Sequence, residues 1–156
     1  AGGFVGFDPT IREDLWQDEH LLRLCLRQAL QLADVVKLSE EEWRLISGKT
    51  QNDRDICALA KEYEIAMLLV TKGAEGVVVC YRGQVHHFAG MSVNCVDSTG
   101  AGDAFVAGLL TGLSSTGLST DEREMRRIID LAQRCGALAV TAKGAMTALP
   151  CRQELE

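Results

Sequence analysis

The sequence has 156 residues, of which 47% are hydrophobic and 24% charged. This composition is typical of one globular domain, and it excludes a disordered tail and a collagen-like repeat. No apolar run approaches the roughly 20 residues that a membrane-spanning helix needs. The formal net charge of −6 argues against nucleic acid or an anionic membrane as a partner. Any anion must therefore be bound by a local device.

Six cysteines lie at least 15 residues apart, at positions 25, 57, 80, 95, 135 and 151. This spacing contains no CxxC pair and does not support a zinc ribbon or a thioredoxin-type site. We expect free thiols in a reducing cytoplasm rather than a disulfide framework. The chain opens on Ala1-Gly-Gly without a methionine, which we interpret as a piece of a longer protein.

The hydrophobic pattern predicts alternating strands and helices along the chain. In chain order these are a buried strand at 4–7, a helix at 17–32, a strand at 34–38, a helix from 40 to about 48, a helix at 53–63, a strand at 66–71, strands at 77–81 and 84–88 around an Arg-Gly turn, a helix at 103–113 and a helix at 121–142. Strand–helix–strand alternation indicates a parallel sheet covered on both faces. We predict one domain over 1–156, with a three-layer α/β/α, Rossmann-like fold and an antiparallel hairpin.

The sharpest motif is the run from Asp97 to Phe105, which reads Asp-Ser-Thr-Gly-Ala-Gly-Asp-Ala-Phe. Glycines at a helix start expose backbone amides that can hold an anion. A carboxylate there, Asp103, could accept the proton of a substrate hydroxyl during phosphoryl transfer. The alternative is a plain turn with Asp103 as a helix cap. Gly108, further along, is expected to bring this helix close to the sheet.

Two common nucleotide motifs are absent from the sequence. A Walker loop needs GK[ST] after its glycines, and a dinucleotide fingerprint would need glycine where Phe105 stands. A second acidic motif, Ser39 followed by Glu42, matches a capping box, in which a hydroxyl and a glutamate cap a helix start.

Five motifs in order resemble the ribokinase-like (pfkB-type) carbohydrate kinases over the whole chain. The run Asp97–Asp103 resembles the D-T-x-G-A-G-D signature of this family. The others are Phe7–Arg12 (F-D-x-N-x-R), Val36–Glu42 (K-x-N-x-x-E), Leu69–Gly76 (V-T-x-G-x-x-G) and Ala139–Ala145, which resembles the last nucleotide loop. Thr10 and Ser39 stand where the family usually has Asn. The stretch Arg12–Trp16 is similar to bacterial fructokinases within this family.

The resemblance implies an ATP-dependent sugar kinase, with D-fructose as the expected acceptor and Mg²⁺ as cofactor. It implies Asp103 as catalytic base, with the amides of Gly100, Ala101 and Gly102 holding the transferred phosphoryl group. Arg12 would contact the substrate, and Glu42 would support Mg²⁺ through water. Nucleotide contacts are implied for Ser39, Thr71, Lys72, Gly73, Ala74, Glu75, Gly76, Gly102 and Gln133. A monovalent cation, K⁺, would lie near Asp97, Thr99, Ala139, Ala142, Gly144 and Ala148.

Two other functions stay open on the sequence. One is a ribosyl or nucleoside kinase of the same family, because the sugar-contacting region of this family is mostly N-terminal to the part matched here. The other is a non-catalytic nucleotide-binding module. We expect these residues to form the C-terminal, nucleotide-binding half of a longer enzyme, inactive without the other half. The full-length enzyme would be cytoplasmic and compatible with a homodimer.

Overall fold

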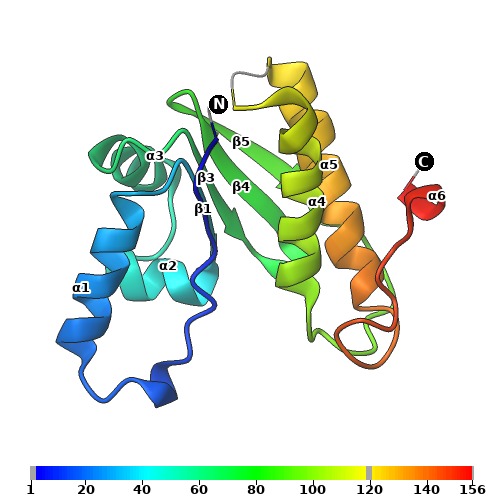
Figure 1. Ribbon diagram of the computed structural model, residues 1–156, viewed down its shortest axis with the longest axis horizontal. Coiled ribbons are helices and arrows are strands. Elements are labelled where there is room, and N and C mark those ends of the chain that lie inside the picture. The colour runs from blue at the N-terminus through cyan, green and yellow to red at the C-terminus, as the bar shows by residue number, and fades with distance from the viewer. Residues whose placement is uncertain (1–2, 119–120, 156) are drawn as a thin grey trace. The chain divides into compact units, whose positions relative to one another are not determined.

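The computed structural model describes residues 3–118 and 121–155, which fall into two compact units. The first unit comprises the chain up to Gly73 together with Val77–Phe88, and the second comprises Ala74–Gly76 and the chain from Ala89 onward. Most of the elements are labelled in Figure 1. In chain order they are β1 Gly6–Phe7, η1 Glu13–Leu15, α1 Glu19–Leu30, β2 Val35–Ser39, α2 Glu40–Ser47, α3 Asp53–Glu62, β3 Met67–Thr71, η2 Gly73–Glu75, β4 Gly76–Tyr81, β5 Gln84–Ala89, α4 Ala101–Thr116, α5 Glu122–Ala139 and α6 Arg152–Leu155.

The five strands form one mixed sheet whose order follows the sequence, β1-β2-β3-β4-β5. β1, β2 and β3 are parallel, and β4 returns antiparallel to β3, with Thr71 opposite Val77 and Met67 opposite Tyr81. Arg82 and Gly83 then connect β4 to β5, both with positive φ, as a two-residue hairpin requires. The prediction of an α/β fold with a mixed sheet is confirmed.

The core of the first unit lies between one face of the sheet and the helices α1, α2 and α3. Val36 and Leu38 of β2 and Leu68 and Val70 of β3 alternate along their strands and are all fully buried. From the helices, Leu30, Trp43, Ile56 and Ala60 pack into the same cluster. Because successive residues of β2 and β3 are buried, these strands appear in the sequence as continuous apolar runs.

The first strand is shorter and more exposed than the sequence predicted. Instead of a buried strand at 4–7, β1 contains two residues, and Val5 before it is 52% exposed. The reason is its position at the edge of the sheet, where it pairs only with β2. Hydrophobic residues alone did not distinguish this edge from the buried strands.

The helix boundaries of the first unit follow from their caps. Ser39 and Glu42 form the expected capping box, and Gly48 ends α2 in a left-handed conformation at φ 69°. Asp18 accepts hydrogen bonds at the start of α1, and Asn52 does so at the start of α3. The predicted helices at 17–32 and 53–63 are therefore confirmed, with ends shifted by one or two residues.

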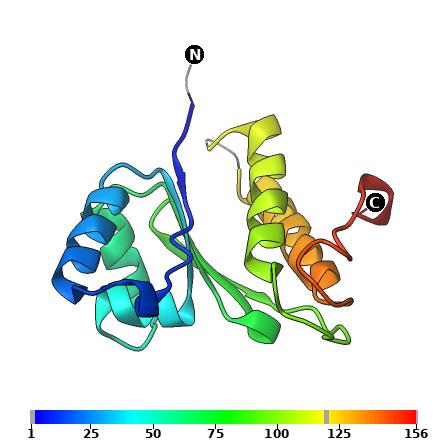
Figure 2. The ribbon, with the colours of Figure 1, turned by 60° about the horizontal axis from the view of Figure 1, so that its bottom comes forward.

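In the second unit, α4 and α5 lie side by side (Figure 2) and run antiparallel. A side chain at Gly108 would meet the Cα of Ala132 at 2.9 Å, and one at Gly112 would meet Ile128 at 2.8 Å. Gly108 thus permits close packing against α5, and the expectation that it faces the sheet is wrong. Gly108 and Gly112 both face α5 because residues four positions apart lie on the same side of a helix.

The boundaries of these two helices also differ from the predicted ones. α4 begins at Ala101, two residues before the predicted start, because Gly100 rather than Asp103 occupies the cap position. α5 ends at Ala139 rather than 142, and the short α6 was not predicted. Within the described ranges, no helix combines the length and apolarity needed to cross a bilayer.

Candidate functional site

The start of α4 is built around Gly100. Its φ of 82° is left-handed, and a Cβ there would lie 2.8 Å from the carbonyl oxygen of Ala145. Both the conformation and the space therefore demand glycine. The Ala101 N–H donates to the Ser98 carbonyl at 3.2 Å, and the Ala104 N–H donates to the Gly100 carbonyl at 2.9 Å. These bonds complete a tight turn that leads directly into the helix.

No side chain in the described part of the chain caps the N-terminus of α4. By contrast, four other helices have a side-chain cap at their N-terminus. The caps of α1, α2, α3 and α5 are Asp18, Ser39, Asn52 and Asp121, respectively. The first N–H groups of any α-helix have no acceptor within the helix. At α4 the Ala101 N–H is bonded to the Ser98 carbonyl, and the other amides of the first turn, with the positive end of the helix dipole, are available to an anion.

Asp103 is the third residue of α4, and its side chain is exposed. Gly100, Ala101 and Gly102 before it are half-buried. The structure thus brings an accessible carboxylate and uncapped amides together in one turn.

Asp97 connects this turn to the segment that follows α5. Its Oδ1 accepts the Thr99 hydroxyl at 2.7 Å and the Thr99 N–H at 3.0 Å, and its Oδ2 accepts the Gly144 N–H at 2.8 Å. These hydrogen bonds, the Thr99 hydroxyl first, lower the pKa of Asp97 below its ordinary value. The predicted cation-site residues Asp97, Thr99 and Gly144 are therefore neighbours.

The remaining residues predicted for the cation site lie in the same segment. The Val140 carbonyl accepts the N–H groups of Val96 at 2.8 Å and Asp97 at 3.2 Å. Ala139 before it is buried, and Ala142 and Ala148 after it are half-buried. Carbonyl oxygens and a carboxylate are the donors that a hard cation prefers, so the donor set of this segment suits K⁺.

In the first unit, the predicted residues gather at the carboxyl ends of β2 and β3. Ser39 and Thr71 are the last residues of these strands and lie opposite each other. The Thr71 hydroxyl donates to the Leu38 carbonyl at 3.3 Å. The carboxyl ends of parallel strands are where α/β proteins bind ligands.

Glu42 is 8% exposed, and both of its carboxylate oxygens are engaged. Its Oε2 accepts the Ser39 N–H at 2.7 Å, and its Oε1 accepts the Ile11 N–H at 3.0 Å. The second bond ties the segment after β1 to the start of α2. In this arrangement Glu42 has a clear structural role, and its remaining lone pairs suit a water-mediated rather than a direct contact with Mg²⁺.

Comparison with known proteins identifies the class to which this geometry belongs. Residues 1–152 match the family model described as pfkB family carbohydrate kinase. The chain belongs to this family. A fructokinase of Escherichia coli is 99% identical over all 156 residues, and one of Klebsiella pneumoniae is 54% identical. The chain spans 51% of the length of each of these two relatives.

Solved structures of the family superpose well on the chain. A double mutant of the Vibrio cholerae O395 fructokinase, bound to fructose, ADP and potassium, is 41% identical with a TM-score of 0.89. It covers 99% of this chain, which spans 49% of it. Aminoimidazole riboside kinase from Salmonella enterica, bound to its riboside and an ATP analogue, is 36% identical with a TM-score of 0.87. It covers 99% of this chain, which spans 52% of it. The ribokinase-like fold that the motifs predicted is thereby confirmed.

The structure shows the consequence of one departure from the family pattern. Thr10 stands where the family motif has Asn, and its φ is 43°, in the left-handed region. Asn tolerates that region, whereas a β-branched residue is strained there. The turn at Thr10 precedes the Ile11 N–H that binds Glu42. Arg12, the predicted substrate contact, is exposed.

Sequence reasoning missed Gly90, which holds the predicted nucleotide turn in place. Its N–H donates to the Glu75 carbonyl at 3.2 Å. A Cβ at Gly90 would lie only 2.0 Å from the Ala74 carbonyl oxygen and 2.8 Å from the Gly76 nitrogen. The chain after β5 thus lies directly against the turn of Ala74–Gly76. Nothing local to Gly90 in the sequence signals this contact.

A second missed feature is the ion pair between Lys37 and Asp8. Their Nζ and Oδ1 atoms are 3.1 Å apart, and the side chains are 10% and 16% exposed. Lys37 lies inside the apolar strand β2, and Asp8 follows β1. A charged residue within an apolar run was the available signal, because a buried lysine needs a partner.

Gln133, predicted at the adenine, is half-buried on α5, one turn before Gly136. A Cβ at Gly136 would be 3.2 Å from the Ala101 carbonyl, so this part of α5 adjoins the first turn of α4.

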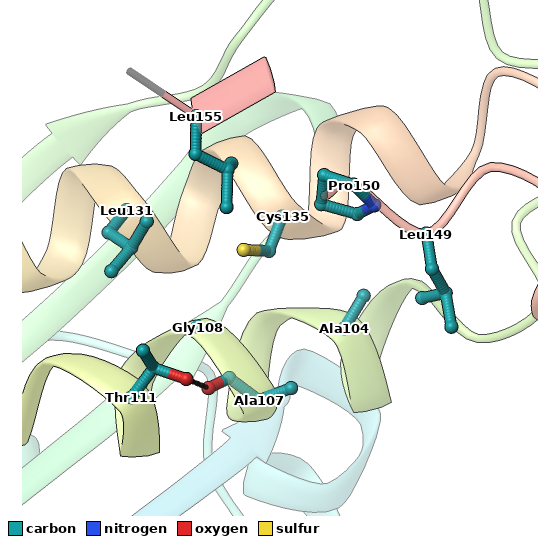
Figure 3. Close-up of a pocket in the computed structure, with 9 residues that line it drawn as sticks. All are labelled: Ala104, Ala107, Gly108, Thr111, Leu131, Cys135, Leu149, Pro150 and Leu155. Atoms are coloured by element: carbon teal, nitrogen blue, oxygen red, sulfur yellow. Dashed lines mark hydrogen bonds between the residues drawn. The ribbon is translucent and has the colours of Figure 1, made fainter. Parts of the chain in front are cut away.

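An apolar pocket of about 220 Å³ lies between α4, α5 and the C-terminal segment (Figure 3). In the described chain, its lining includes Cys135 and Leu155 but none of the predicted site residues.

Proposed function

We propose that these residues are the nucleotide-binding half of an ATP-dependent fructokinase. The observation that carries the proposal is the first turn of α4, where uncapped amides and the exposed Asp103 share one helix start. The likeness to fructokinases, one of them bound to fructose and ADP, supports the assignment of the sugar. The prediction of a single domain over 1–156 is part of this proposal.

In the proposed reaction, a hydroxyl oxygen of D-fructose attacks the γ-phosphorus of ATP in line, and ADP leaves. Asp103 accepts the hydroxyl proton as the new phosphorus–oxygen bond forms. The amides at Gly100 and Gly102 are proposed to face the transferred group, where developing negative charge is stabilised by fixed dipoles. The predicted Ala101 amide would have to leave the Ser98 carbonyl to join them. Because Gly100 is confined by Ala145, this turn needs little rearrangement when the charge develops.

The nucleotide is proposed to lie along the ends of β2 and β3. Ser39 and Thr71 would border it, together with the turn from Lys72 to Gly76 that Gly90 supports, and Gln133 would lie at the adenine. Arg12 is exposed and offers a guanidinium suited to bidentate contact with phosphate or sugar oxygens.

Mg²⁺ and K⁺ are the cations proposed for this half. Glu42 would support Mg²⁺ through water, and the phosphates would complete its coordination. No cluster of three or more acidic, histidine or cysteine side chains in the described ranges could hold a metal by itself. Asp97, Thr99 and the carbonyls of residues 139–148 would hold K⁺. Mg²⁺ would supply charge neutralisation at the phosphates. The residues that would hold K⁺ also stabilise the turn at Gly100, because Asp97 bonds Thr99 next to it.

The test is the substitution Asp103→Asn in the full-length enzyme, with Glu124→Gln as the matched control. Both residues are the third residue of a helix, so the control reproduces the loss of charge near a helix start. In an ADP-release assay with fructose and Mg·ATP, Asp103→Asn should lower kcat by about 10²–10⁴-fold with little change in ATP affinity. The control should stay close to wild type. A kcat for Asp103→Asn within twofold of wild type would remove Asp103 from the mechanism.

A second candidate, a ribosyl or nucleoside kinase, is favoured by the 36% identity to aminoimidazole riboside kinase. The same assay with fructose, ribose and a riboside separates the two, since the true acceptor should have the highest kcat/KM. Binding of Mg·ATP without turnover of any acceptor would instead support the non-catalytic module. The homodimer, the cytoplasmic location and the absence of a nucleic-acid partner stay predictions.

A further inference from the structure

Cys57 and Cys80 form a close thiol pair within the first unit. Their Sγ atoms are 3.2 Å apart, although 23 positions separate them in the chain. Cys57 lies on α3 and Cys80 on β4, so the pair joins a helix to the sheet. Disulfide formation would require the two sulfurs to approach by only about 1 Å more.

The surroundings hold both thiols in place. Ile56, next to Cys57, is fully buried in the core cluster that also contains Cys80. The first turn of α3 is attached to β5 by Asp53, whose carboxylate lies 3.0 Å from Nε2 of His87. The Cys57 thiol also lies 3.5 Å from the Gly83 carbonyl at the hairpin turn. Since these contacts hold the first part of α3 and Cys57 itself against the sheet, the Cys57 sulfur stays close to that of Cys80.

We propose that Cys57 and Cys80 are an oxidation site, at which a small-molecule disulfide converts the two thiols into an intramolecular disulfide. Cys57 is half-buried, whereas Cys80 is 2% exposed. The oxidant therefore meets Cys57 first, and Cys80 acts as the resolving thiol. Burial, followed by the contact with Cys57, raises the pKa of Cys80 to about 12, which agrees with this order because the thiolate is the attacking form.

The exchange proceeds in two balanced steps. The Cys57 thiolate attacks one sulfur of the oxidant, whose S–S bond breaks, and the departing thiolate takes up a proton. Cys80 then loses its proton and attacks the Cys57 sulfur, the mixed disulfide breaks, and the second thiol leaves. Overall, two protein thiols are oxidised to one disulfide and the oxidant is reduced to two thiols.

The position of the pair predicts what the disulfide does. Cys80 lies opposite Leu68 in the sheet, whereas Val77, at the other end of β4, lies opposite Thr71. Three strand positions of about 3.3 Å each separate the two pairs. The disulfide should therefore fasten α3 to β4 and raise thermal stability, while the turn after Thr71 stays unchanged.

Peptide mapping of the full-length protein tests the proposal directly. The native protein is incubated with oxidised glutathione, the remaining thiols are alkylated, and the protein is cleaved with trypsin. Cleavage after lysine and arginine places Cys57 in peptide 55–61 and Cys80 in peptide 73–82. We expect these two peptides to be joined, and the midpoint of thermal unfolding to rise by about 5–10 °C.

Two variants resolve the steps, and a third serves as the control. Cys80→Ser should stop at a glutathione adduct on Cys57, and Cys57→Ser should leave Cys80 reduced. Cys25→Ser, which removes an exposed thiol on α1, should not change the cross-link. The proposal is wrong if wild-type Cys57 keeps its glutathione while Cys80 is alkylated, if the joined peptides contain other cysteines, or if oxidation lowers the unfolding midpoint.

Discussion

Gly90→Ala is the substitution whose effect follows most directly from the structure. The added Cβ would lie 2.0 Å from the Ala74 carbonyl oxygen, and contacts below 3.0 Å are essentially never observed. The backbone must therefore move by about 1 Å, because the opposing atoms are also backbone. That movement would stretch the 3.2 Å hydrogen bond from Gly90 to Glu75. Overpacking costs about 1–3 kcal/mol and the lost hydrogen bond about 1 kcal/mol, so unfolding should become about 2–4 kcal/mol easier.

Denaturant unfolding, followed by circular dichroism, measures this loss. Gly3→Ala is the matched control, since nothing lies within 4 Å of a Cβ at Gly3, and an exposed substitution changes stability by about 0.5 kcal/mol at most. Gly90→Ala should also weaken ATP binding, because the displaced turn is the proposed nucleotide contact. An unfolding free energy of Gly90→Ala equal to that of the control would show that Gly90 does not support this turn.

Three further substitutions test other parts of the site. Thr10→Asn should raise the free energy of unfolding by about 1 kcal/mol in chemical denaturation, because Asn accepts the left-handed backbone; a loss of stability would contradict this. Glu42→Gln places an NH₂ group against a backbone N–H, so it should lower the free energy of unfolding by about 1–3 kcal/mol in the same measurement. It should also raise the Mg²⁺ concentration for half-maximal rate, and an unchanged Mg²⁺ curve would exclude the metal role. Hydrogen bonds lower the pKa of Asp97 in the folded protein, so it stabilises the fold above its ordinary pKa of 3.8 and loses that effect as pH falls through the lower folded value. Unfolding at several pH values should therefore show the gap between wild type and Asp97→Asn closing in acid, and an Asp97→Asn variant should respond differently to K⁺.

Much of the architecture follows from local sequence signals. The apolar runs of β2 and β3, the capping box at Ser39 and the glycine at position 48 define their elements because each acts over a few residues. The order of five family motifs likewise indicated the family. Local information also indicated the turn that we propose for anion binding, since its glycines and the start of α4 are adjacent in the chain.

Other features depend on residues far apart in the sequence, and only the tertiary structure decided them. The second oxygen of Glu42 binds Ile11, 31 positions away, and Asp97 binds Gly144, 47 positions away. Gly90 must be glycine because Ala74 lies against it, and Cys57 meets Cys80 because α3 packs on β4. Hydrophobic periodicity predicts which face of a helix or strand is buried, but not which residue it meets there. Those partners are determined by how the elements pack, and so the sequence alone determined the elements and the family, while the packing assigned each polar group its neighbour.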